Sequence, residues 1–251
     1  MPSKSDIDLE TKSVDSKKKI APKELKELKR VFNKLCNWSD KYKIKEKIKI
    51  INEKLNNPPL GCQFSDHESN DILLSEKSSL ELLLEELNAS NNKTIRVQDT
   101  AAAFRSLGKK VSKREVLDMM WEVDEKLDNV IDWDEFLLMF SRNINDESGL
   151  EPSAFYHMVQ FMIYDCDDNG KVSVDETMNM LYARVGREKM ESMISLLFGE
   201  GDGGEVIEEG YQGGEIDFCR YWEVVEREQI KVFEKSELGQ AICERKKSRR
   251  R

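Results

Sequence analysis

The run "YDCDDNGKVSVDET" at residues 164–177 concentrates four aspartates, an asparagine, a glycine and a glutamate. Within it, residues 165–176 place oxygen-bearing groups at alternate positions, and Gly170 stands sixth, where a sharp turn favours a positive φ. Ca²⁺ takes about 6–8 oxygen ligands, and a twelve-residue loop supplies them at positions 1, 3, 5, 7, 9 and 12. This spacing predicts ligation by Asp165, Asp167, Asn169, the carbonyl of Lys171, Ser173 through water, and a bidentate Glu176. The alternative is an acidic surface turn that binds no ion.

Three other segments repeat the plan of a helix, a loop and a second helix. Aligned on their central apolar residue, loops 88–99, 124–135 and 165–176 have Ile95, Ile131 and Val172 at the same position, and Ile216 marks a fourth loop. Apolar residues recur at helical spacing on either side of the loops. The repeat predicts two lobes, in which each pair of loops is joined by a short antiparallel ladder, Ile95 with Ile131 and Val172 with Ile216.

The second loop is a weaker candidate for a metal site. Its predicted ligands are Asp124, Asp128, the carbonyl of Val130, Asp132 and Glu135. Its third position, however, holds Lys126, whose ammonium group would compete with the ion. Asn129 replaces the glycine, and asparagine tolerates the left-handed conformation that the turn requires.

The first and fourth loops are expected to hold no ion. The first offers Asn88, Ser90 and Asn92, with few charged ligands. The fourth follows the insertion "GEGDGGEVIEEGYQGGE" from residue 199 and has Arg220 at the last ligand position, where a guanidinium cannot coordinate a cation.

The segment "FRSLGKKVSKREVLDMMWEVDEKLDNVIDWDEFLLMFSRN" (104–143) resembles the join of the first two hands of calmodulin and troponin C. Over residues 78–230 this resemblance implies an EF-hand calcium-binding fold. The stretch "ETMNMLYARVGREKM" (176–190) resembles the calcium-binding subunit of the outer dynein arm docking complex, which implies a cytoskeletal setting in the axoneme of a cilium. The departures from the family are one intact loop instead of four, the insertion in the last hand and the basic extensions.

The expected fold is all-α, with two EF-hand pairs, an N-terminal helical extension and a long C-terminal helix. The predicted organisation is a disordered arm (1–21), a basic helical extension (22–60), a linker (61–77), an N-terminal EF-hand pair with degenerate loops (78–145), a C-terminal pair with one intact and one degenerate loop (150–235), and a basic tail (236–251).

The net charge of −9 combines an acidic body with basic ends. Residues 21–60 carry 11 Lys or Arg against 5 Asp or Glu, and residues 243–251 carry 6 against 1. We expect the basic ends to contact acidic protein surfaces, and we expect no nucleic-acid partner. No run approaches the ~18 apolar residues of a membrane span. The start lacks a secretory signal and the five cysteines are scattered, so an intracellular, cytoplasmic protein with reduced thiols is predicted.

Two functions from different classes agree with these features. The first is a calcium-modulated binding subunit of a larger intracellular assembly, with a helix or coiled coil as partner. The second is a constitutive structural adaptor in which one Ca²⁺ only stabilises the C-terminal lobe; Mg²⁺ is expected to compete for the site. No enzyme is expected, because the two histidines, His67 and His157, belong to no cluster with metal-ligand spacing and no phosphate-binding loop occurs.

Overall fold

The computed structural model describes residues 20–56, 66–90, 93–185, 187–198, 214–236 and 239–241, and side-chain placement excludes 66–69 and 181–190. The described chain is almost entirely helical, with two short two-stranded ladders, which confirms the all-α fold with EF-hand pairs. The predicted disordered arm, the insertion in the fourth loop and most of the basic tail lie outside the described residues. None of the described helices has the length and apolar character needed to cross a membrane.

The chain divides into two compact units, and each is described by itself. One contains residues 30–106 and 110–133, and the other contains the residues up to 29, residues 107–109 and everything from 134 onward. This division falls inside the predicted N-terminal EF-hand pair, because helix α7 (Trp133–Ile144) groups with the C-terminal hands.

The first unit contains the hand-one loop, the hand-two loop up to residue 133 and the helical extension from residue 30. Its elements are the part of α2 (Pro22–Leu35) from residue 30, α3 (Trp38–Asn56), α4 (Asp66–Ala89), β1 (Ile95–Arg96), α5 (Val97–Ser106), α6 (Lys113–Trp121) and β2 (Val130–Ile131). Asn37 adopts a positive φ of 56°, which lets the chain turn between α2 and α3. Strands β1 and β2 are antiparallel, with Ile95 opposite Ile131, as predicted. Both isoleucines are fully buried, so the ladder that joins the two loops belongs to the core.

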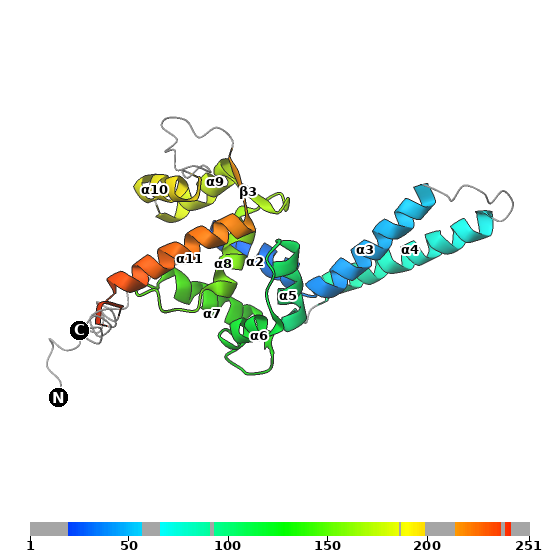
Figure 1. Cartoon of the computed structure of the whole chain (residues 1–251). Coiled ribbons are helices and arrows are strands. Elements are labelled where there is room, and N and C mark those ends of the chain that lie inside the picture. The colour runs from blue at the N-terminus through cyan, green and yellow to red at the C-terminus, as the bar shows by residue number, and fades with distance from the viewer. Residues whose placement is uncertain are drawn as a thin grey trace. The chain divides into compact units, whose positions relative to one another are not determined.

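Part of the predicted linker at 61–77 is helical, because helix α4 already begins at Asp66. In Figure 1, α3 and α4 run side by side as a hairpin. The less exposed α4 positions recur every three or four residues, as a helix requires to keep one stripe against its neighbour: Leu73, Lys77, Leu80, Leu84 and Leu87. A narrow stripe is enough to hold a helix, so the polar residues around it do not prevent helix formation.

The second unit contains hands three and four. Its further elements are α8 (Ala154–Tyr164), β3 (Lys171–Ser173), α9 (Val174–Val185), α10 (Arg187–Phe198), β4 (Glu215–Asp217) and α11 (Phe218–Lys235). Phe161 of α8 lies edge-on to Phe218 of α11, with ring centroids 5.1 Å apart, and both contact Tyr221. The β3–β4 ladder pairs Val172 with Ile216, again as predicted. The aromatic core therefore fixes the two helices on either side of this ladder.

Helix α6 begins with a reciprocal capping box. The Ser112 hydroxyl accepts from the Glu115 N–H at 3.2 Å, and the Glu115 carboxylate accepts from the Ser112 N–H at 2.6 Å. Ser112→Ala should lower the free energy of unfolding by about 1 kcal/mol, measured by urea denaturation, because one N–H at the helix start loses its acceptor. Ser112→Gly should lower the free energy of unfolding by only about 0.3 kcal/mol. Equal stability of the serine and alanine proteins would contradict a capping role.

Candidate metal centre

The loop at 165–176 is closed by hydrogen bonds from its backbone to its own carboxylates. Asp165 follows directly after α8 and is only 2% exposed. Its two carboxylate oxygens accept from the N–H groups of Asn169 (3.0 Å) and Gly170 (3.2 Å). Gly170 has a φ of +81°, the conformation expected for the sixth position. The loop therefore folds around the carboxylate at its first position.

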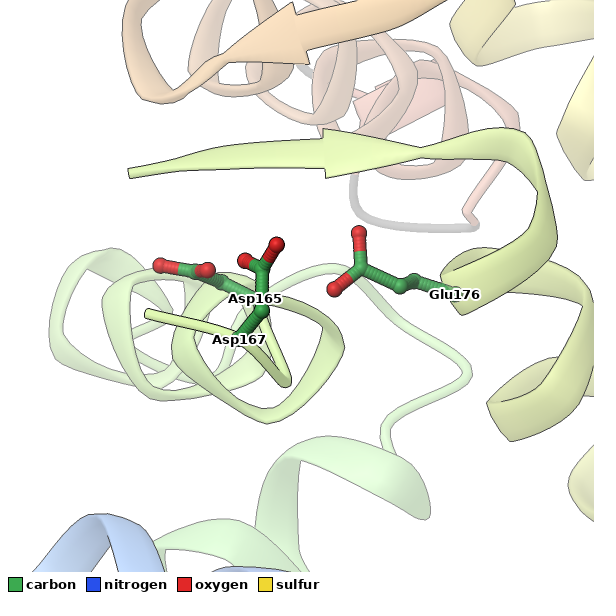
Figure 2. A group of neighbouring side chains, drawn as sticks. All are labelled: Asp165, Asp167 and Glu176. Atoms are coloured by element: carbon green, nitrogen blue, oxygen red, sulfur yellow. The ribbon is translucent and has the colours of Figure 1, made fainter. Parts of the chain in front are cut away.

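Three carboxylates converge inside this loop. Asp165, Asp167 and Glu176 each offer an oxygen, and these oxygens lie within 4.8 Å of one another. Figure 2 shows Glu176 reaching from the start of α9 toward the two aspartates. Carboxylates this close repel one another when all are ionised, so a cation between them is favourable. Hard oxygen ligands of this kind suit Ca²⁺.

The remaining predicted ligands lie among these carboxylates. The Asn169 side chain donates to Asp167 at 2.9 Å and accepts from the Lys171 N–H at 2.7 Å. The Ser173 hydroxyl donates to Glu176 at 2.8 Å. The Lys171 ammonium pairs with Glu215 across the β3–β4 ladder, at 3.1 Å. The donor set of the loop thus fits a calcium ion, for which Asp165, Asp167, Asn169, Ser173, Glu176 and the carbonyl of Lys171 remain the proposed ligands.

Loop 124–135 has the same backbone hydrogen bonds, but a positively charged side chain occupies one of its ligand positions. The Asp124 carboxylate accepts from the N–H groups of Asp128 (3.2 Å) and Asn129 (2.7 Å), and Asn129 has a φ of 64°. Here the Lys126 ammonium at position three is ion-paired with Asp132 at position nine. One predicted ligand therefore already has a positive partner, and the lysine replaces a ligand as well.

Two further side-chain ligands were predicted in this loop. Asp128 accepts from the Val130 N–H at 3.2 Å, and Glu135 is buried in the first turn of α7. Among the described residues, the only group of three or more His, Cys, Asp or Glu side chains within reach of one ion is the one in loop 165–176. Calcium at loop 124–135 therefore stays a prediction that the geometry does not favour.

Loop 88–99 also contains a positively charged side chain that pairs with carboxylates, and this pairing was not predicted from the sequence. Arg96 donates to Asp99 at 2.8 Å and to Asp40 of α3 at 2.7 Å. Asp99 is fully buried, and it also accepts from the Ser39 N–H at 2.9 Å. The hydrogen bond to Asp99 raises the pKa of Arg96, and the Arg96 hydrogen bond lowers the pKa of Asp40. Asp99, at the twelfth position of this loop, and Arg96 therefore attach the hand to the helical extension.

The described part of the fourth hand likewise uses its polar residues for structure. The Asp217 side chain caps α11 by accepting from the Arg220 N–H at 2.8 Å. The Arg220 guanidinium lies 4.0 Å from Glu223 on the same helix. Residues 199–213, which include the start of this loop, lie outside the described part.

Cys166 occupies a non-ligating position in loop 165–176. Its backbone N–H donates to Glu176 at 3.0 Å, whereas its sulfur lies 3.6 Å from the Ile163 carbonyl oxygen. Cys166→Ser keeps the backbone contact, so calcium affinity in reductant should change by less than about twofold in calorimetry. Asp167→Asn, which removes a charged ligand, is the comparison and should weaken binding clearly. A large loss in Cys166→Ser would show that the thiol is part of the site.

Comparison with known proteins agrees with this geometry. Residues 100–143, from α5 to α7, match the family described as "EF-hand domain pair". A calmodulin-like protein of Oryza sativa subsp. japonica is 27% identical over 139 residues, which is 55% of this chain and 79% of the relative. The calcium-binding proteins CML20 and CML19 of Arabidopsis thaliana are each 27% identical over 109 residues. Those alignments cover 43% of this chain and 62% of each relative.

These similarities support a place among EF-hand calcium-binding proteins. The matched family segment contains loop 124–135, whereas the converging carboxylates lie in the following hand. The segment that matches the family model and the candidate metal centre therefore lie in different parts of the chain.

Proposed function

We propose that the protein binds one Ca²⁺ in loop 165–176 and acts as a calcium-modulated binding subunit of a larger intracellular assembly. The observation that carries this proposal is the convergence of Asp165, Asp167 and Glu176 at the junction of α8 and α9. Similarity to calmodulin-like proteins supports it. The resemblance of residues 176–190 to an axonemal docking subunit suggests the axoneme as the setting to examine first.

A cavity of about 380 Å³ in the same unit supports a binding role. It lies among α8, α10 and α11, and its lining includes Tyr164, Leu196, Leu197, Val225 and Val232. An apolar cavity of this size fits one or two large side chains of a partner helix. Such a partner would gain affinity from the hydrophobic effect.

The metal centre and the cavity share a helix. Tyr164 lines the cavity and is the last residue of α8, and Asp165 is the next residue along the chain. Glu176 lies in the first turn of α9. A cation that binds both carboxylates fixes the end of α8 relative to the start of α9, and this is how calcium would bias the shape of the cavity.

A structural adaptor is the second candidate, and the positively charged side chains inside the first two loops favour it. Lys126 and Arg96 pair with loop carboxylates in hands two and one, so these hands are held without calcium. In that case, calcium would only stabilise loop 165–176. A calcium titration followed by NMR separates the two: shifts confined to 165–176 indicate the adaptor, and shifts that extend to Leu197 and Val225 in the cavity indicate the sensor.

The partner itself is tested by affinity capture with and without calcium. We expect partners that bind the wild type in calcium to be lost both in chelator and with Glu176→Gln. Asp175→Asn is the matched control, because it removes the same charge from an exposed, non-ligating position of the loop. Partners that bind equally in all four samples would contradict calcium modulation. Repeating the capture with Mg²⁺ alone tests whether that ion occupies the site without promoting binding.

A further inference from the structure

The α3–α4 hairpin has a second surface besides the seam that joins its helices. The seam takes α4 residues such as Leu73, Leu80 and Leu84, together with Ile44 and Ile51 of α3. The residues that immediately precede these seam positions in the sequence face solvent. On α4 they include Ile72 and Leu83, which are 67% and 44% exposed, and on α3 they include Ile50, which is 44% exposed.

These exposed residues form one continuous stripe on each helix. The α3 stripe is Lys43, Lys47, Ile50 and Lys54, and the α4 stripe is Ile72, Glu76, Ser79, Leu83 and Glu86. Each stripe repeats every three or four residues, so its members stay on one face of the helix. In an antiparallel pair, the positions one residue before the seam lie on the same side of both helices. The two stripes therefore form a single face, called the arm face below.

On the arm face, α3 contributes Lys43, Lys47 and Lys54, and α4 contributes Glu76 and Glu86. Over the whole helices, α3 has a formal charge of +3, from six lysines and three acidic residues, and α4 has a formal charge of −6, from seven acidic residues and one lysine. A two-fold axis parallel to the helices places α3 of each copy over α4 of the other copy. A surface that is basic along one helix and acidic along the other is then complementary to its own symmetry mate.

We propose that the arm face binds the arm face of a second copy of this chain and forms a four-helix dimer contact. Burial of Ile50, Ile72 and Leu83 from both copies supplies the apolar centre. The lysine stripe of one copy then lies against the glutamate stripe of the other and sets the register. A monomer would leave both the apolar residues and the divided charge without a partner surface.

The first test is the mass of the full chain in solution, measured by sedimentation over a roughly hundredfold range of concentration. The expected result is a reversible shift from the 29.2 kDa monomer toward twice that mass. Ile72→Ser with Leu83→Ser should weaken dimerisation at least roughly tenfold, because apolar area is lost from each copy. Leu74→Ser with Leu82→Ser is the matched control, since these exposed leucines lie on other sides of α4 and should leave the dimer intact.

The second test uses charge reversal. Lys47→Glu with Lys54→Glu makes both stripes acidic, and Glu76→Lys with Glu86→Lys makes both stripes basic. Each variant alone should be monomeric, and an equimolar mixture should form a heterodimer. Circular dichroism confirms that each variant keeps its helices. A wild type that stays monomeric throughout, or folded charge variants that fail to pair when mixed, would overturn the proposal.

Discussion

Glu176→Gln should weaken calcium binding by at least roughly a hundredfold. The loss of a residue that merely supports a ligand costs about 10–100-fold in metal affinity, and Glu176 is a proposed bidentate ligand. Its carboxylate is one of the three that converge in loop 165–176, and it also accepts from the N–H groups of Cys166 and Ser173. The amide keeps the size of the side chain but loses its charge and one acceptor oxygen. Isothermal calorimetry measures the change.

The matched control is Asp175→Asn, which removes one negative charge from the preceding position. Asp175 is exposed and lies outside the predicted ligand set, so its loss should weaken binding only slightly, and less so as salt is raised. Equal losses in the two variants would mean that the ion responds to the general negative field of the loop instead of to ligation by Glu176.

Lys126→Asp should create a second calcium site in loop 124–135. This substitution removes the ammonium that pairs with Asp132 and places a carboxylate at the third ligand position. Asn129 already adopts the positive φ that the sixth position requires, and Asp124 already accepts from the backbone as Asp165 does. Calorimetry should therefore count two ions per chain in place of one.

Lys126→Met separates the two effects of that change. Methionine removes the positive charge but adds no oxygen ligand, so binding at loop 124–135 should stay weak. If wild type already binds two ions, Lys126 does not block its loop. If Lys126→Asp binds only one, the lysine is not what keeps the loop empty.

Local spacing explains why the gathering of carboxylates in loop 165–176 could be predicted from the sequence. The proposed ligands fall within twelve residues, and the turn at Gly170 is part of the same short segment. The ladder partners Ile95 and Ile131 were predictable for a related reason, because each is the central apolar residue of a repeated unit.

The features that the sequence did not reveal depend on segments far apart in the chain. Arg96 bonds Asp40, 56 residues earlier, and Asp99 caps the backbone at Ser39, 60 residues earlier. Helix α4 already begins at Asp66 and packs against α3, whereas the polar composition of its first turns indicated a linker. The pairing of Lys126 with Asp132 is local. A lysine at a ligand position indicated that it would compete with the ion, but the sequence did not indicate which carboxylate the lysine would pair with.

Native mass spectrometry with calcium counts the ions bound to each chain. We expect one Ca²⁺ per chain in the wild type, no ion with Glu176→Gln, and one ion with Asp175→Asn. A wild type without calcium, or a Glu176→Gln protein that keeps its ion, would contradict a metal centre in loop 165–176.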